Sequence, residues 1–332
     1  MNLYKLTDFG DQEIIIGSRA DYGRKDNLRL VQPKWLKSVN NDISNSLNFK
    51  KNYGFDEDLF LQKYHLRAVQ FGNWMNYNDR ADHFLALVQA LGDLDKIIHT
   101  DNIGYYGKMS VALGARGRGK ALAHYEPSMK VINLTKERGG HSFAHEYGHA
   151  IDFLAGEYFS KCNTFSLSSA SSTQTIQSNG KVDEVRNLMN IVLDGVRCGE
   201  RYEKLADWAA GNGPAAYAYW CNNTEIWART FAQWVALRCR EEKIKDVVLC
   251  GSVDTGTLSN IPETELKKLA PYIKKLVMLV TSWLEGVITK PPAATTKNPF
   301  EKQAAAITKP KKKAAAQNKP ASKALSKKSK AK

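Results

Sequence analysis

The chain has 332 residues, of which 43% are hydrophobic and 25% are charged, and its formal net charge is +14 at pH 7. This size and composition allow one large domain with appendages or two small ones. No apolar run reaches the roughly 18 to 20 residues of a membrane helix, and acids and amides near the N-terminus argue against a signal peptide. The five cysteines are an odd number without close pairing, which indicates buried thiols in a reducing compartment rather than a disulfide framework.

The first 70 residues form an N-terminal extension in which no pattern carries chemistry by itself. After them, Asp79 can cap a helix of core residues that stops near Gly92. The next element that we predict is a Gly-rich β-hairpin, in which Val111–Ala115 pairs with Lys120–Tyr125 around a turn at Gly117–Gly119. In such a hairpin an exposed edge can take up an extended peptide by strand addition.

A helix that we predict from about His141 to Ala155 follows a short strand at Lys130–Thr135. It contains the motif His-Glu-x-x-His, at residues 145 to 149. Residues four apart lie on one face of a helix, so His145 and His149 can present two imidazole nitrogens to one metal ion. Beside them, Glu146 can take a proton from a water that the metal activates, which is the zincin arrangement. The alternative is a partly buried helix whose histidines serve packing.

A catalytic zinc needs a third protein ligand and an open fourth position. The longer metzincin motif, which would supply that ligand nearby, is absent, because Asp152 and Ala155 occupy its positions. We predict Glu225 as the third ligand of one zinc ion per chain, since it begins a later segment of helical periodicity. The alternative for Glu225 is a first-turn carboxylate favoured by the helix dipole. Rival ligands are Glu157, Asp183, Glu184 and Glu203.

Three further residues are candidates for supporting roles at this site. Asp152 lies one turn beyond His149 and can orient an imidazole from the second shell, or it can be an ordinary surface carboxylate. His124 and Tyr125, on the second strand of the predicted hairpin, can act as electrophilic helpers in the transition state. Equally, both can be strand residues whose polar atoms are satisfied in the core.

The rest of the chain before residue 291 is predicted to be largely helical. Residues 162–181, rich in Ser, Thr, Gln and Asn, predict a mobile loop that either covers the cleft or is a plain surface loop. Helical spacing then recurs from Asp183, around Leu205 and Trp208, through the Glu225 segment, and from Leu266 to Leu284.

From residue 291 to 332 the composition changes to Lys, Ala, Pro, Ser and Thr, with 12 Lys and one acid, Glu301. This segment therefore carries +11 of the +14 total. It lacks the apolar content that folding requires, so we predict a disordered tail. Its charge suits non-specific binding to DNA or RNA phosphates, or it only aids solubility. The densest charge is at Lys311, Lys312, Lys313, Lys327 and Lys328.

Several separated motifs between about residues 65 and 240 resemble the zincin-like large polyvalent protein-associated domain (type 1) of bacteriophage and mobile-element proteins. They are Phe71-Gly72-Asn73-Trp74, the run from Leu113 to Pro127, Val131 to Thr135, Ala144 to Asp152, and Tyr219-Trp220 with Glu225 to Phe231. The resemblance implies a single-domain metallopeptidase-like fold and matches His145, His149, Glu146 and Glu225 to expected site positions. One departure is Ala232, where the family usually has an acid, and it puts a second-shell contact in doubt.

The sequence thus predicts an α+β protein with a zincin-like domain at 71–290, in which a small β-sheet lies over the helix that carries the motif. The predicted function is zinc-dependent hydrolysis of a protein or peptide substrate, in the host cytoplasm or in a virion. The alternative is a nucleic-acid-associated accessory or virion protein whose metal site is structural. An intact Glu146 favours the enzyme, because a structural site needs no base.

Overall fold

The structure is a computed structural model, which describes residues 4–6, 14–16, 61, 63–72, 75, 77–100, 102–115, 122–135, 139–160, 165–169, 180–246 and 248–287. Most of the N-terminal extension, the glycine-rich turn, most of the predicted loop at 162–181 and the whole predicted tail lie outside these residues. The predictions made for them therefore stay predictions.

A four-stranded mixed sheet contains β3 (Ala68–Phe71), β4 (Ser110–Leu113), β5 (Ala123–Glu126) and β6 (Val131–Leu134). The strand order is β3-β4-β6-β5, and the first three strands of this order are parallel. All residues of those three strands are buried, which is usual for parallel strands covered on both faces. A separate antiparallel pair joins β1 (Tyr4–Leu6) to β2 (Ile14–Ile16).

The predicted hairpin between Val111–Ala115 and Lys120–Tyr125 is wrong. β5 pairs antiparallel with β6, and the neighbours of β4 are β3 and β6. The four residues Pro127–Lys130 join β5 to β6 as a tight turn, in which Lys130 takes a left-handed conformation with φ 55°. The glycines at 117–119 resemble a turn sequence, but the hairpin forms around the shorter connection Pro127–Lys130, which joins β5 to β6. β5 therefore lies at one end of the sheet.

Seven helices lie within the described residues, and together with the sheet they confirm the α+β class. Their bounds are α4 (Tyr77–Ile98), α5 (Phe143–Ser160), α6 (Gly180–Arg197), α7 (Glu200–Gly211), α8 (Pro214–Trp220), α9 (Asn223–Glu241) and α10 (Glu263–Val287). The predicted stop near Gly92 is wrong, because α4 continues for another turn and a half. Leu94, Ile97 and Ile98 in that extension are buried in the core.

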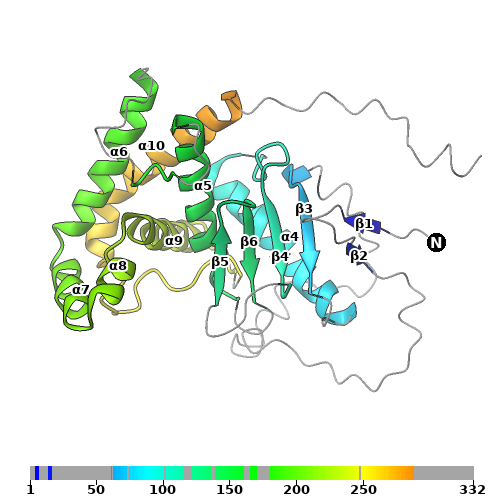
Figure 1. Cartoon of the computed structure of the whole chain (residues 1–332), viewed down its shortest axis with the longest axis horizontal. Coiled ribbons are helices and arrows are strands. Elements are labelled where there is room, and N and C mark those ends of the chain that lie inside the picture. The colour runs from blue at the N-terminus through cyan, green and yellow to red at the C-terminus, as the bar shows by residue number, and fades with distance from the viewer. Residues whose placement is uncertain are drawn as a thin grey trace, which may run out of the picture. The chain divides into compact units, whose positions relative to one another are not determined.

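One hydrophobic core joins the sheet to α4, α5, α6, α9 and α10. Figure 1 shows α5 beside β5 and β6, with α9 lying against α5 on the side away from the sheet. Three large aromatic residues of this contact, Tyr147, Trp227 and Phe231, are fully buried. None of the helices in the described part of the chain combines the length and apolarity that a bilayer crossing requires.

Candidate metal centre

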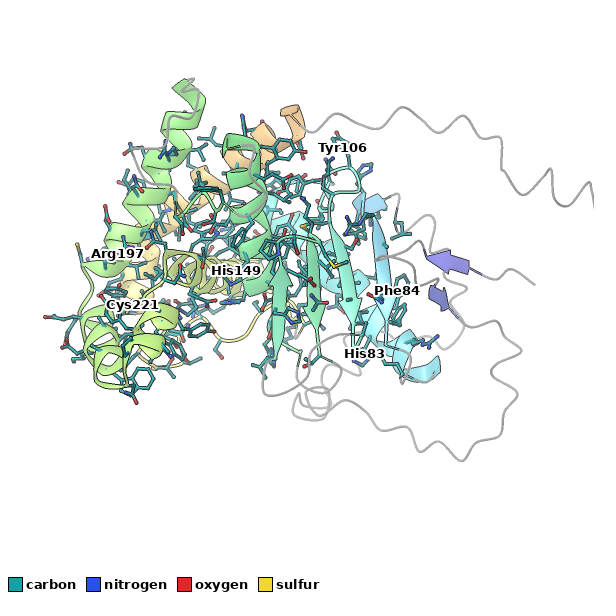
Figure 2. All side chains as sticks on the ribbon, in the orientation of Figure 1. His83, Phe84, Tyr106, His149, Arg197 and Cys221 are labelled. Atoms are coloured by element: carbon teal, nitrogen blue, oxygen red, sulfur yellow. The ribbon has the colours of Figure 1, made fainter. Side chains whose placement is uncertain are left out.

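Three side chains from two helices converge between α5 and α9. Nε2 of His145 and Nε2 of His149 are 3.2 Å apart, and the oxygens of Glu225 lie 3.6 Å and 3.4 Å from these two nitrogens respectively. A tetrahedral zinc ion with ligand bonds near 2.05 Å separates its ligand atoms by about 3.3 Å. The three donors therefore have the spacing of a metal triad, and Figure 2 shows His149 where α5 and α9 lie side by side.

The start of α5 is fixed by backbone hydrogen bonds from a distant loop. The N–H groups of Phe143 and Ala144 donate to the carbonyl oxygens of Val248 (3.2 Å) and Leu249 (2.8 Å). Because the first N–H groups of a helix have no partners within it, this loop replaces a side-chain cap. The motif is thus anchored one residue before His145, and the helix begins at Phe143 rather than at the predicted His141.

The close approach of the two ligand helices depends on Gly148, between the two histidines. A Cβ atom at this position would lie 3.2 Å from Cα of Ala228 and 3.2 Å from the ring of Phe231. The indole of Trp227 donates a hydrogen bond of 3.0 Å to the carbonyl of Gly148. These contacts bring the first turn of α9, which carries Glu225, over the histidine pair.

Burial and mutual charge set the protonation of the triad. Burial, then the neighbouring His149, lowers the pKa of His145 to about 4. Burial opposes the charged form of His149 too, but hydrogen bonding and charge from Glu225 raise its pKa. Burial likewise opposes ionisation of Glu225, yet His149 holds its pKa below the usual value. Oε2 of Glu225 is buried without a hydrogen-bond partner among the described residues, as expected of an atom that would bind a cation.

Glu146 lies beside the triad, and its side chain is 5% exposed. Burial raises its pKa to about 7, although His149 and a hydrogen bond from the backbone N–H of Tyr125 act in the opposite direction. Glu146 nevertheless lines an open cleft together with His145 and Glu225. Its carboxyl group can therefore reach a molecule bound there.

Asp152 is fully buried, and its carboxylate is bonded to Ser168 rather than to an imidazole. The oxygens of Asp152 accept hydrogen bonds from the backbone N–H (2.8 Å) and the hydroxyl (2.6 Å) of Ser168. Burial nevertheless raises the pKa of Asp152 to about 6. Nδ1 of His149 has no hydrogen-bond partner within the described residues. The predicted orienting bond from Asp152 is thus not seen, and this carboxylate fixes residues 165–169 against α5.

The two predicted helpers on β5 do not reach the metal triad. The ring of Tyr125 packs against Phe153, with centroids 6.0 Å apart, and burial holds the pKa of its phenol well above the ordinary value. Since successive strand residues point to opposite faces, His124 lies on the face of the sheet away from α5. The alternation of residues along the strand could not show which face of the sheet lies toward the metal triad.

Glu157, Glu184 and Glu203, the three rival third ligands whose side chains the structure describes, do not join the group formed by His145, His149 and Glu225. Glu157 pairs with Lys130 at 3.0 Å, and Glu184 pairs with Lys275 at 2.7 Å. Glu203 is exposed on α7, and the side chain of Asp183 is outside the described residues, as are the tail lysines.

A cleft of about 520 Å³ opens in front of the triad. Its walls come from the start of α5, the end of α8, one face of α9, the residues before β5, and the loop 251–260. Sequence reasoning did not identify His141, Tyr219 or Arg229 as cleft residues. Two signals pointed to Tyr219 and Arg229: Arg229 follows Glu225 by four residues, a spacing that puts both on one helix face, and Tyr219 and Arg229 both lie in the motifs that carry the family resemblance.

No protein-family model, no curated protein and no solved structure matches this chain. The function proposed below therefore depends on the residues of the triad, on Glu146 and on the cleft.

Proposed function

We propose that the protein is a zinc-dependent metallopeptidase with a zincin-like fold, related to the phage and mobile-element domain that its motifs resemble. The observation that carries the proposal is the convergence of His145, His149 and Glu225 beside Glu146 in an open cleft. A helix with two histidines four residues apart, an acid next to the first, and a carboxylate from a second helix is the donor set that this chemistry requires.

The donor set fits zinc. Two imidazole nitrogens and one carboxylate oxygen are ligands that zinc accepts, and three protein ligands leave a fourth position free. The unpartnered Oε2 of Glu225 and the spacing of the three donors support the same assignment. When bound, zinc supplies Lewis acidity toward a substrate carbonyl and lowers the pKa of water.

Glu146 supplies the proton transfer. Its carboxyl group lies in the cleft next to His145 and Glu225. From this position it can accept a proton from an attacking water and return it to the leaving amine. The buried aromatic contact between α5 and α9 positions Glu146 relative to Glu225.

The test combines metal analysis with proteolysis of a mixed peptide library by the purified full chain. We expect one zinc per chain and cleavage that a chelator abolishes. Glu146→Gln keeps the size of the side chain and removes its basicity, so it should retain zinc and lower cleavage by roughly 10²-fold or more. The matched control is Glu157→Gln on the same helix, which should cleave as wild type does. If zinc-loaded Glu146→Gln protein cleaves peptides as fast as wild type, Glu146 is not the general base and the proposed mechanism is wrong.

A second function is supported by the charge of residues 291–332, which is +11. In this alternative the protein is a nucleic-acid-associated accessory or virion protein, and the metal site only stabilises its fold. Zinc binding without any peptide cleavage, together with nucleic-acid binding through the tail, would favour this alternative.

A further inference from the structure

Helix α8 leaves its aromatic side chains uncovered. None of its seven residues is buried, although the sequence Pro-Ala-Ala-Tyr-Ala-Tyr-Trp is almost entirely apolar. Tyr217 is 47% exposed and Tyr219 is 52% exposed, and on the preceding helix Trp208 is 46% exposed. Helices of soluble proteins normally bury an apolar face, and contiguous exposed aromatic groups mark binding surfaces.

Tyr219 and Trp208 form a continuous surface with the partly exposed Trp220 of α8. We call these three rings, Trp208, Trp220 and Tyr219, the aromatic ladder. Trp208 meets Trp220 edge to face at 5.9 Å, and Trp220 meets Tyr219 edge to face at 5.2 Å. Tyr219, Trp220 and Glu225 line the same cleft. The ladder therefore extends from the cleft that contains Glu225 to Trp208 on α7.

Arg229 contacts Trp220, the middle ring of the ladder. Its Nη2 donates a hydrogen bond of 2.5 Å to the carbonyl of Trp220, and its guanidinium lies 5.3 Å from the centre of that indole ring. Because Arg229 follows Glu225 by one helical turn, α9 positions both the metal ligand and the ring next to it.

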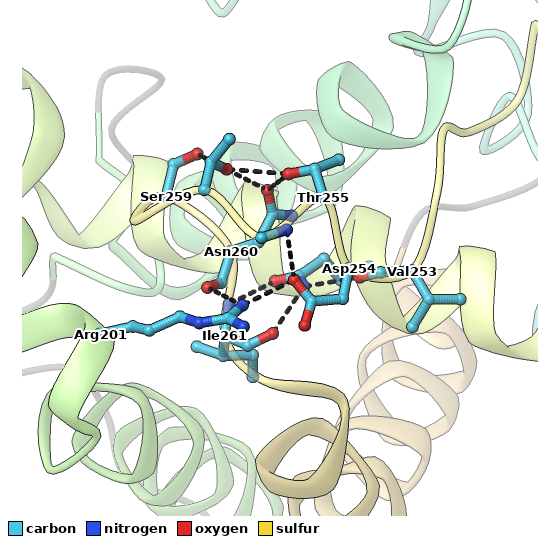
Figure 3. Close-up of polar contacts among 10 residues, drawn as sticks. Arg201, Val253, Asp254, Thr255, Ser259, Asn260 and Ile261 are labelled. Carbon is cyan, nitrogen blue, oxygen red and sulfur yellow. Dashed lines mark hydrogen bonds and ion pairs between the residues drawn. The ribbon is translucent and has the colours of Figure 1, made fainter.

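Polar contacts shown in Figure 3 tie α7 to the opposite rim of the cleft. Nη1 of Arg201 lies 2.6 Å from a carboxylate oxygen of Asp254 and 3.3 Å from the carbonyl of Asn260. The buried amide of Gln233, on α9, donates to the carbonyls of Val253 and Ile261. The helix that carries Trp208 and the loop 251–260 are therefore fixed relative to the triad, so the ladder is a preformed surface.

We propose that the aromatic ladder binds a large apolar or aromatic side chain of the polypeptide substrate, next to the bond that is cut. The identification of the ligand as a polypeptide rests on the proposed function. Aromatic rings give large contact areas at small entropic cost, which suits recognition of such side chains. Within the described residues, Leu122 on the rim near β5 adds a further exposed apolar group to the same cleft.

The charge around the ladder argues against nucleic acid as its ligand. Helix α7 contains three acids and two bases, and α8 contains no charged residue. Lys204 is paired with Glu200 and Arg201 with Asp254, whereas Glu203 and Asp207 are exposed. A stacking platform for bases requires a positively charged path for phosphates, which α7 does not provide.

The experiment measures binding separately from cleavage. Zinc-loaded full-length Glu146→Gln protein is titrated into fluorescein-labelled dodecapeptides that carry one Phe or Trp, with Ser at that position in matched peptides. We expect the aromatic peptides to bind at least about tenfold tighter, the scale of a well-placed aromatic contact. Adding Tyr219→Ala or Trp208→Ala should erase this preference, whereas Tyr219→Phe should keep it. Tyr272→Ala, a truncation of an exposed tyrosine on α10, is the matched control.

Three results would overturn the inference. The first is equal affinity for the aromatic and the Ser peptides, and the second is an equal loss of affinity for both peptides in Tyr219→Ala or Trp208→Ala. The third is a loss of oligothymidine binding in Trp208→Ala. These results are distinct from failure of the proposed function. If the wild-type protein binds the aromatic peptides selectively but cleaves none of them, the peptidase proposal is wrong and the ladder is confirmed as a binding surface. If the wild-type protein cleaves the aromatic and the Ser peptides equally well, the role of the ladder is wrong and the peptidase proposal stands.

Discussion

Glu225 is distinguished from the other acids in the described part of the chain by what its carboxylate faces. It lies between two imidazoles with one oxygen unpartnered, whereas Glu203 is exposed on α7. Glu225→Ala should therefore abolish stable zinc retention, because two histidines alone make a weak site. Zinc per chain, measured after dialysis against a mild chelator, checks this, with Glu203→Ala as the control. Full zinc in Glu225→Ala and loss in Glu203→Ala would show that the third ligand is misassigned.

Asp246 is a buried, titratable residue that holds the loop from which α5 starts. Its Oδ1 accepts hydrogen bonds of 2.8 Å from the backbone N–H groups of Val248 and Leu249, the two residues whose carbonyls hold α5. Burial raises the pKa of Asp246 to about 7, and the neighbouring carboxyl of Asp93 acts in the same direction. The protonated form is thus the one that the folded protein prefers.

Asp246→Asn should therefore change how stability depends on pH. A raised pKa in the folded state contributes stability that is complete below the unfolded pKa, near 4, and is lost as pH rises through 7. Asn keeps the oxygen that holds Val248 and Leu249 and carries no charge, so the variant should match wild type near pH 4 and exceed it at pH 8. The difference should be on the order of a few kcal/mol. Urea unfolding at both pH values measures it.

Asp254→Asn provides a control of opposite sign. The hydrogen bond from Arg201 lowers the pKa of Asp254, so the charged form stabilises the fold above the unfolded pKa and this stability is lost on acidification. This variant should be less stable than wild type at pH 8. An Asp246→Asn protein that is also weaker at pH 8 would show that the carboxylate of Asp246 is stabilised in the folded state.

At the scale of elements, the contact between α5 and α9 sets the geometry of the triad. Gly148→Ala would place a methyl group 3.2 Å from Cα of Ala228, and backbone atoms cannot yield as a flexible side chain can. We expect α9 to shift outward and carry Glu225 away from the histidines. Zinc affinity should then fall by about tenfold or more, and packing should cost about 1–3 kcal/mol.

The control for this substitution is Gly286→Ala in α10, where an added methyl group meets nothing within 4 Å. There the higher helix propensity of Ala should stabilise the protein by roughly 0.5–1 kcal/mol. Zinc titration and thermal unfolding of both variants make the comparison. Unchanged zinc affinity in Gly148→Ala would mean that α9 tolerates the methyl group without moving Glu225.

The sequence allowed prediction of those elements whose signals are local. Helical periodicity indicated α5 and α10 to within a few residues, and the His-Glu-x-x-His spacing indicated one ligand face. The partner of β5 was not predictable in this way, because strand pairing is a contact between distant segments and a run of glycines imitates a turn. For the same reason, the structure was needed to show that Tyr219 of α8 and Arg229 of α9 line one cleft with the start of α5.

At the scale of the whole chain, the charge is divided very unequally. Residues 291–332 carry +11, so the first 290 residues carry +3 of the +14 total. We therefore expect different chemical partners for the proposed catalytic cleft and for the basic segment: a polypeptide for the first and a polyanion for the second. If both proposals hold, binding of nucleic acid by the basic segment would keep the proposed peptidase domain near substrates on the same polymer and raise their effective concentration.

The basic segment should bind DNA and RNA without sequence preference. Each phosphate contact releases counterions, so a segment with 12 Lys should lose affinity steeply as salt rises, by roughly 10³-fold or more between 50 mM and 200 mM if at least six lysines engage. Gel shifts with unrelated duplexes of equal length, performed with the full chain and with a chain ending at Lys290, make the test. The shorter chain should show little binding, and its zinc content and peptide cleavage should equal those of the full chain. Equal binding by the two chains would place the nucleic-acid surface within the first 290 residues, and binding by neither would leave the basic segment without this role.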